Sequence, residues 1–221
     1  MFQTLRLHFS KTGYSKYLSH LDLVRCFTRA VKRSGLNAWY TEGYNRHLYL
    51  MFALPLALGI ESTAEAVDIR LQENASSVGE ILHALNCLLP KGIEVLNLST
   101  PLYSHKEITS ARYILHVKGS SGYLYSFKNC IDDLFAQPQI PIEKKMGGKT
   151  RVLNIKDQIH SWAFLNANRG VLIDLIVDAG NERNLNPMVV YNLAADRVKG
   201  KSDGYSLIRT GIIVRNGDNF E

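Results

Sequence analysis

The order of apolar patterns along the first part of the chain restricts the fold more than any other feature of the sequence. Strand-like alternation or short apolar runs occur at residues 5–9, 48–53, 66–71 and 93–98, and helix-like spacing occurs at residues 21–34 and 77–89. The resulting order of strand, helix, two strands, helix and strand is the βαββαβ plan of a ferredoxin-like sandwich. We therefore predict an α+β fold for this part of the chain.

The second half of the chain repeats this plan less regularly. We expect strands at residues 112–117, 171–177 and 206–214, helices at residues 123–135 and after Asn186-Pro187, and a hairpin of residues 140–145 and 150–155 across Gly147-Gly148. Residues 156–169 are interpreted as an insertion, and a polar break near Pro101 separates the halves. The prediction is two ferredoxin-like (βαββαβ) sandwiches in tandem, the second less regular, with domains at residues 1–100 and 108–221.

The helix predicted at residues 21–34 carries a basic face. Ser19 is expected to cap its start, Asp22 to reach back to the Ser19 backbone N–H, and Gly35 to end it. The stripe predicted to face inward consists of Leu21, Val24, Phe27, Thr28 and Val31. The cations at i, i+4, i+7 and i+8 on another face are Arg25, Arg29, Lys32 and Arg33. Two interpretations stay open, a solvated basic face and a surface that contacts phosphate.

The distribution of charge favours a phosphorylated partner. The chain of 221 residues is 46% hydrophobic, which suits packed globular domains, and its formal net charge is +6. Residues 1–52 contain eight Lys or Arg against two acidic residues, residues 53–100 two against six, and residues 101–221 sixteen against twelve. Because the basic excess is concentrated in the first quarter, we expect nucleic acid or another phosphorylated partner to bind there.

Two loops add residues that suit nucleic acid. Lys11 and Lys16 lie close in sequence to Tyr14 and Tyr17, and the segment Tyr44-Asn45-Arg46-His47 follows the basic helix. Tyrosine stacks on bases, while cations and amides contact phosphates and base edges. The residues predicted to bind nucleic acid are Lys11, Lys16, Arg25, Arg29, Lys32, Arg33, Tyr44, Asn45, Arg46 and His47.

Two histidines are the candidates for catalysis. His20 and His47 would act as acid and base near neutral pH in a metal-free ribonuclease, with Arg25 or Arg29 stabilising the charge of the transition state. The alternative is that Tyr44 and His47 only stack and form hydrogen bonds in a binding cleft. Both interpretations stay open.

No metal or cofactor is predicted. The grouping of metal-ligand residue types is His20, Asp22, His47 and Glu61, but His20 and Asp22 do not share a helix face, so Asp22 is interpreted as a cap. The three cysteines are too far apart for a CxxC site. The sequence also lacks GxxxxGK[ST], GxGxxG, HExxH and GxSxG, the usual motifs for nucleotide, dinucleotide, zinc-protease and serine-hydrolase chemistry.

The sequence predicts a cytoplasmic location without membrane association. The first residues alternate like a strand and lack the basic, apolar and small-residue regions of a signal peptide. No apolar run reaches the ~18 residues that a membrane span needs. Three cysteines without a pairing pattern suit a reducing compartment.

Several motifs in the first hundred or so residues together resemble one protein family. They are Arg6-x-x-Phe9-Ser10-Lys11-x-Gly13, Leu18-Ser19-His20-Leu21-Asp22-Leu23, Arg29-Ala30-x-Lys32-Arg33-Ser34-Gly35-Leu36, Gly43-Tyr44-Asn45-x-His47 and Phe52-Ala53-Leu54-Pro55-Leu56-x-Leu58-Gly59-Ile60-Glu61-Ser62. On these motifs the chain is similar to the bacterial radical-SAM-linked family of unknown function. Its members occur alone or as C-terminal extensions of cobalamin-binding radical SAM proteins. Tyr44, Arg46 and Leu48 stand where that family usually has Phe, Pro and Pro, which loosens the turn.

The resemblance implies a radical SAM protein as a partner. Some members of the family are associated with genes for a ribonuclease of the G type or for ribosomal proteins, which points towards RNA. The main hypothesis is therefore an accessory RNA-binding protein, for tRNA, rRNA or a ribonucleoprotein, that works with a radical SAM enzyme. Two alternatives stay open: a metal-independent ribonuclease or RNA-modification subunit, and a protein-docking module for the radical SAM partner.

Overall fold

The chain divides into two compact units in the computed structural model. The first unit comprises Met1–Ile108 and Arg209–Glu221, and the second comprises Thr109–Ile208. The structure describes residues 1–73, 76–146, 148–167 and 169–221. Within these ranges, no helix combines the length and the apolar character that crossing a membrane requires.

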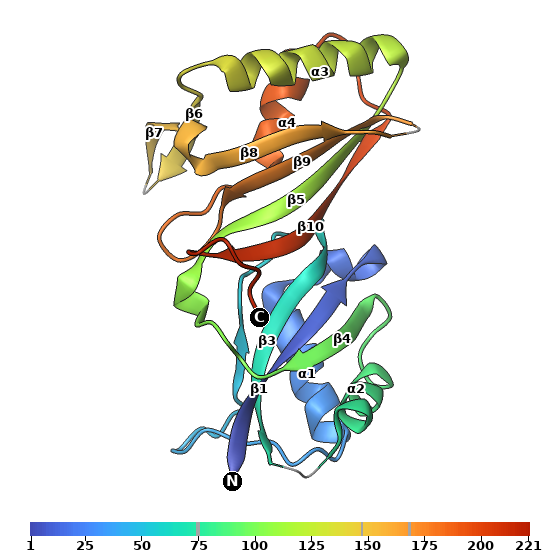
Figure 1. Ribbon diagram of the computed structural model, residues 1–221, viewed down its shortest axis with the longest axis vertical. Coiled ribbons are helices and arrows are strands. Elements are labelled where there is room, and N and C mark those ends of the chain that lie inside the picture. The colour runs from blue at the N-terminus through green and yellow to red at the C-terminus, as the bar shows by residue number, and fades with distance from the viewer. Residues whose placement is uncertain (74–75, 147, 168) are drawn as a thin grey trace. The chain divides into compact units, whose positions relative to one another are not determined.

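The first unit is built on an antiparallel sheet. Its elements in chain order are β1 (Phe2–Lys11), the 3-10 helix η1 (Gly13–Tyr17), α1 (His20–Arg33), β2 (Leu50–Phe52), β3 (Glu61–Gln72), α2 (Val78–Asn86), β4 (Ile93–Ser99) and the 3-10 helix η2 (His105–Glu107). β1 lies between β4 and β3, and the short β2 pairs with β3 (Figure 1). The last part of β10 (Gly204–Val214), from residue 209 onward, also belongs to this unit.

One face of this sheet supplies the core of the first unit. The buried cluster contains alternate residues of two strands (Leu5, Leu7, Phe9, Val67, Ile69 and Leu71), four residues of α1 (Leu23, Phe27, Ala30 and Val31) and two of α2 (Ile81 and Leu85). Because successive side chains of a strand point to opposite faces, Thr4, Arg6 and His8 face away from these helices. The packing therefore fixes which side of α1 meets the sheet and leaves its other side exposed.

The second unit is also an α+β structure. Its elements are β5 (Ile108–Lys118), α3 (Ser121–Ala136), β6 (Pro141–Met146), β7 (Lys149–Asn154), the 3-10 helix η3 (Lys156–Gln158), β8 (Ile159–Leu165), β9 (Val171–Asp178), α4 (Met188–Ala195) and the start of β10. β9 pairs antiparallel with both β5 and β8, and β10 is the other neighbour of β5. β6 and β7 form a separate two-stranded sheet. Phe127 and Ile131 of α3 and Val190 of α4 are among its buried residues.

The predicted α+β fold class is confirmed. The first unit contains β1, α1, β2, β3, α2 and β4 in the predicted order. The tandem ferredoxin-like arrangement is more specific and stays a proposal. Residues 209–221 group with the first unit, whereas the sequence analysis places them in the second domain.

The prediction of an insertion at residues 156–169 was wrong. η3 and the strand β8 occupy most of this range, and β8 pairs with β9. The strand was missed because its apolar residues, Trp162 to Leu165, are consecutive instead of alternating, and its side chains are exposed or half-buried. The predicted hairpin exists as β6 and β7, although Gly147 of its turn lies outside the described residues.

Candidate nucleic-acid interface

A side-chain cap fixes the start of α1. The Asp22 backbone N–H donates to Ser19 Oγ at 3.1 Å, which confirms Ser19 as the cap. The Asp22 carboxylate accepts hydrogen bonds from the Ser19 hydroxyl at 2.7 Å and from Arg25 Nη1 at 3.1 Å. The expected donor from Ser19 was its backbone N–H instead of its hydroxyl. Hydrogen bonds from Ser19, followed by those from Arg25, lower the pKa of Asp22. Asp22 therefore acts at the helix start and offsets part of the charge of Arg25.

α1 packs through a stripe that differs in phase from the predicted one. Its buried residues are Leu23, Phe27, Ala30 and Val31. Leu21, predicted to face inward, is 57% exposed, and Val24 and Thr28 are half-buried. The prediction was wrong at Leu21 because Leu21, Leu23 and Val24 are all apolar, so helical spacing fits more than one phase at this end.

The four cations of α1 lie on the side away from the buried stripe. Arg25, Arg29, Lys32 and Arg33 are all exposed. Arg25 pairs with Asp22, and both side chains are about half exposed, so water screens that pair. Among the described residues, no hydrogen bond or ion pair involves the side chains of Arg29, Lys32 or Arg33. A bound polyanion would relieve the repulsion between these cations, which is about 0.2–0.5 kcal/mol per i,i+4 pair.

The loop at residues 41–47 is closed at its base by Thr41 and His47. The Thr41 N–H donates to His47 O at 2.9 Å, and the His47 N–H donates to Thr41 Oγ1 at 3.1 Å. His47 Nδ1 lies 3.0 Å from Thr41 Oγ1 and 3.2 Å from Asn45 O. Tyr44 is fully exposed, and Asn45 and Arg46 are exposed beside it. His47 therefore stabilises a loop that presents Tyr44, Asn45 and Arg46 to solvent.

Lys11 is inside the protein, so its predicted contact with nucleic acid was wrong. Its side chain is 1% exposed, and Nζ donates to Leu18 O at 2.8 Å. Burial lowers the pKa of Lys11, and Arg209 lowers it further while Glu65 opposes the shift. Lys11 follows Leu5, Leu7 and Phe9 at the same two-residue spacing in β1, so alternation directs its side chain to their side of the sheet, and the register of β1 with β3 shifts between Phe9 and Lys11.

Lys16 remains near the surface but already has a partner. Its Nζ lies 3.1 Å from Glu61 Oε1 and 5.5 Å from the centre of the Tyr17 ring. Both charged side chains are about a quarter exposed. A pair of this kind contributes about 0–1 kcal/mol, so Lys16 can exchange its partner for a phosphate at little cost.

The two candidate catalytic histidines have separate surroundings. The exposed His20 ring packs edge-on against Phe52, with 5.2 Å between centroids, whereas the His47 ring contacts Thr41 and Asn45. In the part of the chain that the structure describes, no group of three or more His, Cys, Asp or Glu has a geometry that holds a metal ion. These positions assign each histidine a local packing or hydrogen-bonding role, and catalysis by them stays a hypothesis.

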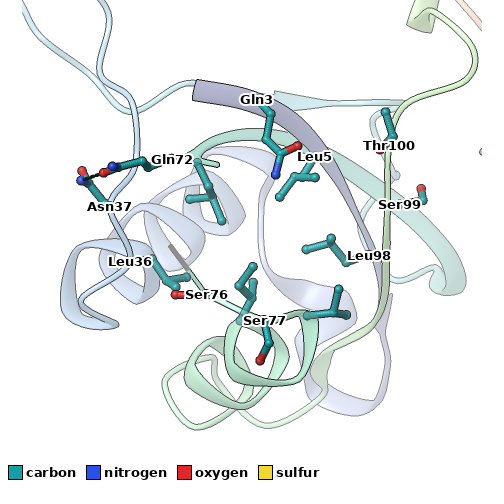
Figure 2. A pocket seen from close by; sticks show the side chains of 13 residues that line it. Gln3, Leu5, Leu36, Asn37, Gln72, Ser76, Ser77, Leu98, Ser99 and Thr100 are labelled. Carbon is teal, nitrogen blue, oxygen red and sulfur yellow. Dashed lines mark hydrogen bonds between the residues drawn. The ribbon is translucent and has the colours of Figure 1, made fainter. Parts of the chain in front are cut away.

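A hollow of about 400 Å³ lies in the first unit near the end of α1 and the start of α2 (Figure 2). Leu5 and Leu98 project into it, and Gln3, Asn37 and Ser77 are among the polar residues at its border. None of the 13 side chains that line it is charged. The hollow therefore adds no cation to the basic face.

The match to a family model covers most of the sequence. The model describes an uncharacterized protein conserved in bacteria (DUF2344) and matches residues 4–187. The chain belongs to this family. Its description names neither an activity nor a radical SAM protein, so the resemblance stated above is confirmed only as membership of a bacterial family of unknown function.

Similarity to solved structures concerns the fold alone. A chain from the "Crystal Structure of a Cbf5-Nop10-Gar1 Complex" matches 94% of this chain at 11% identity with a TM-score of 0.50. The match covers 48% of that chain, so the present chain spans about half its length. An unknown protein from Galdieria sulphuraria matches 97% of this chain and 100% of its own at 14% identity, but its TM-score of 0.28 carries no argument. No curated protein matches the chain.

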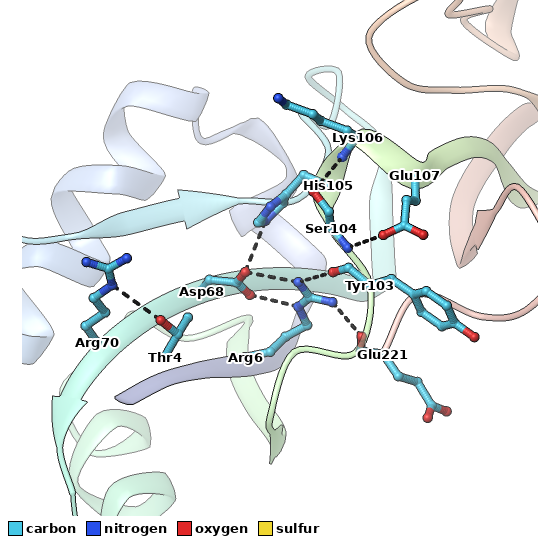
Figure 3. A network of polar contacts seen from close by, with 10 residues as sticks. All are labelled: Thr4, Arg6, Asp68, Arg70, Tyr103, Ser104, His105, Lys106, Glu107 and Glu221. Carbon is cyan, nitrogen blue, oxygen red and sulfur yellow. Dashed lines mark hydrogen bonds and ion pairs between the residues drawn. The ribbon is translucent and has the colours of Figure 1, made fainter. Parts of the chain in front are cut away.

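Sequence reasoning missed a buried charge network in the first unit (Figure 3). Arg6 is fully buried and donates to the two carboxylate oxygens of Asp68 at 2.7 and 3.0 Å. It also donates to the backbone oxygens of Tyr103 and Glu221, at 2.9 and 2.6 Å. His105 Nε2 lies 3.4 Å from Asp68 Oδ2. The network joins β1 and β3 to two segments that are distant in sequence, which no local pattern could indicate.

Two histidines near this network are expected to make the first unit less stable as the pH decreases. Burial lowers the pKa of His8, with Arg6 as the second cause, and burial also lowers the pKa of His105 although Asp68 opposes the shift. As the pH falls through about 6.5, the unfolded chain therefore takes up these protons before the folded chain does, and the free energy of unfolding decreases from about pH 7 to about pH 5. Urea unfolding at several pH values measures this decrease. A His8→Asn, His105→Asn variant should show a shallower decrease, and an equal slope in both proteins would contradict the assignment.

Proposed function

We propose that this chain is an accessory RNA-binding protein and that α1 contacts the phosphate groups of the RNA. The observation that carries the proposal is that α1 exposes four cations on one face, Arg25, Arg29, Lys32 and Arg33. Of these, Arg25 forms an ion pair with Asp22. α1 has 14 residues and is therefore about 21 Å long, so its cations can meet several phosphates of one strand.

Exposed polar and aromatic residues after α1 support the same function. Tyr44, Asn45 and Arg46 project from a loop whose base is fixed by hydrogen bonds, and such residues stack on bases or contact phosphates. Lys16 adds a surface cation, whereas the buried Lys11 is excluded. Six of the eight cations in residues 1–52 remain after Arg6 and Lys11 are set aside, so the surface of this segment is still basic.

We also propose that both units are ferredoxin-like. In the first unit the strands lie side by side in the order β4, β1, β3 and β2, which are the fourth, first, third and second strands of the repeat. In the second unit the order is β10, β5, β9 and β8, and these are again the fourth, first, third and second strands of their repeat. The β6–β7 hairpin is then the insertion of the second repeat. This fold is used by many unrelated functions, so it supports the architecture and not the activity.

The partner and the location are proposed from the sequence alone. The motif resemblance suggests a radical SAM enzyme, and three cysteines without a pairing pattern suggest a reducing compartment such as the cytoplasm. A docking module for the radical SAM enzyme would use the same basic helix against an acidic protein surface. Co-purification of the two proteins that survives nuclease treatment would favour docking, and loss of the complex would favour an RNA bridge.

Replacing Arg25 and Arg29 by alanine is expected to weaken RNA binding about tenfold. Each lost phosphate contact also lowers the slope of log K against log salt by about 0.7 for single strands, so the double variant should have a slope smaller by about 1.4. Fluorescence anisotropy with a labelled RNA at several salt concentrations measures both quantities. The matched control is Lys118→Ala with Lys199→Ala, which removes the same charge from exposed positions of the second unit.

Equal affinity and salt slope in the two double variants would overturn the proposed role of α1. The ribonuclease alternative predicts in addition that the purified wild-type protein cleaves small RNA with and without EDTA. Replacement of His20 by alanine should then abolish cleavage but keep binding.

A further inference from the structure

We infer that the η1 loop, defined here as residues 12–17, binds an unpaired nucleotide, so that the RNA recognised by this chain is single-stranded where it meets the protein. The inference rests on the proposed RNA binding and makes its substrate class more specific. It starts from two exposed rings. Tyr14 is 92% exposed and Tyr17 is 64% exposed, although they flank the buried Ser15 within one short helix.

The backbone that carries these rings is fixed from several sides. The Thr12 N–H donates to Gly92 O at 2.7 Å, and the Ser15 hydroxyl donates to Lys91 O at 2.8 Å. The Gly59 N–H donates to Lys16 O at 3.0 Å. A loop held by hydrogen bonds to two other segments of the chain loses little conformational entropy when it binds, which favours a role in recognition.

Lys11 contributes to this loop from inside the protein. Its buried ammonium group donates to Leu18 O, directly after η1. Residue 92 has to be a glycine because its backbone lies close to the η1 loop, and a Cβ atom at this position would lie 2.4 Å from Thr12 O. The interior is therefore arranged to hold η1 in place, while Tyr14 and Tyr17 stay largely exposed.

A hollow of about 580 Å³ lies beside Tyr14. Its lining includes Tyr14, Ser10, Thr12, the exposed Lys91 and Glu94. The aromatic ring and the one cation match the flat base and the phosphate of a nucleotide, while the hydroxyl groups and the Glu94 carboxylate can accept hydrogen bonds from the donors of a base edge. Lys91 was missed by the sequence analysis because residue 91 approaches the η1 loop only through the fold.

The site adjoins the basic helix. Only Leu18 and Ser19 separate the end of η1 from the start of α1, and Arg25 lies in the second turn of α1. A strand whose bases stack on Tyr14 and Tyr17 can therefore continue along the cations of α1. A duplex is excluded from this contact because its bases are already stacked on one another and present only their edges.

The test compares one short RNA as a single strand and after annealing to its complement. Tyr14→Ala with Tyr17→Ala should weaken binding of the single strand by about tenfold or more, since each base–aromatic stack contributes substantially to affinity, and should change duplex binding less than about twofold. Tyr14→Phe with Tyr17→Phe keeps the rings and should keep the affinity. Tyr125→Ala removes a ring that is 71% exposed on α3 and serves as the matched control.

The outcomes separate this inference from the proposed function. If the Tyr→Ala variant binds the single strand like wild type while the Arg25, Arg29 variant does not, the stacking site is wrong and the phosphate surface stands. A preference of wild type for the duplex also overturns the stacking site. If wild type binds neither form of RNA, both proposals are wrong.

Discussion

Replacing Asp68 by alanine is expected to lower the free energy of unfolding of the first unit by about 3–5 kcal/mol. The change leaves the fully buried Arg6 guanidinium without the carboxylate that accepts two of its hydrogen bonds. The remaining acceptors are the backbone oxygens of Tyr103 and Glu221. Denaturant unfolding measures the loss, with Trp39 as the fluorescent reporter of the first unit in a Trp162→Phe background.

The control for this change is an ion pair at the surface. Arg25→Ala removes the exposed pair with Asp22 and should cost less than about 1 kcal/mol. Asp68→Asn keeps the shape of the side chain but not its charge, and it should fall between the two. If Asp68→Ala lowers the free energy of unfolding by less than about 1 kcal/mol, the prediction is wrong, and water hydrates the Arg6 guanidinium in the variant.

The basic face of α1 could be predicted because its causes are local. The Ser19 cap, the recurrence of apolar residues and the positions of the four cations all lie within about fifteen residues of one another. Helical spacing converts such a segment directly into faces. The sequence therefore predicted that Arg25, Arg29, Lys32 and Arg33 share a face, and the structure places all four at the surface.

Burial of charged residues could not be predicted in the same way. Arg6 and Lys11 both lie in β1, where a charged residue in an alternating pattern usually indicates the solvent side. Asp68, the partner of Arg6, is 62 residues further along the chain. The pairing of β1 with β3 has to be known before the burial of Arg6 can be predicted, and sequence spacing contains no such information.

The role of His47 illustrates the same limit within a loop. Tyrosine, asparagine and histidine often contact ligands, so the sequence predicted that Tyr44, Asn45 and His47 all bind nucleic acid. The structure separates them, because His47 forms hydrogen bonds at the base of the loop while Tyr44 is fully exposed. Residue type alone cannot distinguish the side chain that supports a loop from the one that the loop presents.

Replacing Glu65 by leucine is expected to have the largest effect on the stability of the first unit. The fully buried Arg209 donates through Nε to Glu65 Oε1 at 2.9 Å, and its Nη2 donates to Glu65 Oε1 and to Leu54 O. Glu65 also opposes the lowering of the pKa of the buried Lys11. Its removal therefore leaves the buried cations Arg209 and Lys11 without this counter-charge, and we expect a loss of at least about 3–5 kcal/mol.

The same unfolding measurement separates charge from hydrogen bonding at this position. Glu65→Gln keeps an acceptor for Arg209 but removes the counter-charge, so it should cost less than Glu65→Leu and still more than about 1 kcal/mol. Glu61→Gln is the matched control, because Glu61 pairs with Lys16 at the surface and should contribute about 0–1 kcal/mol. Equal stability of the Glu65→Leu and Glu61→Gln proteins would contradict the conclusion that Glu65 neutralises the cations inside the first unit.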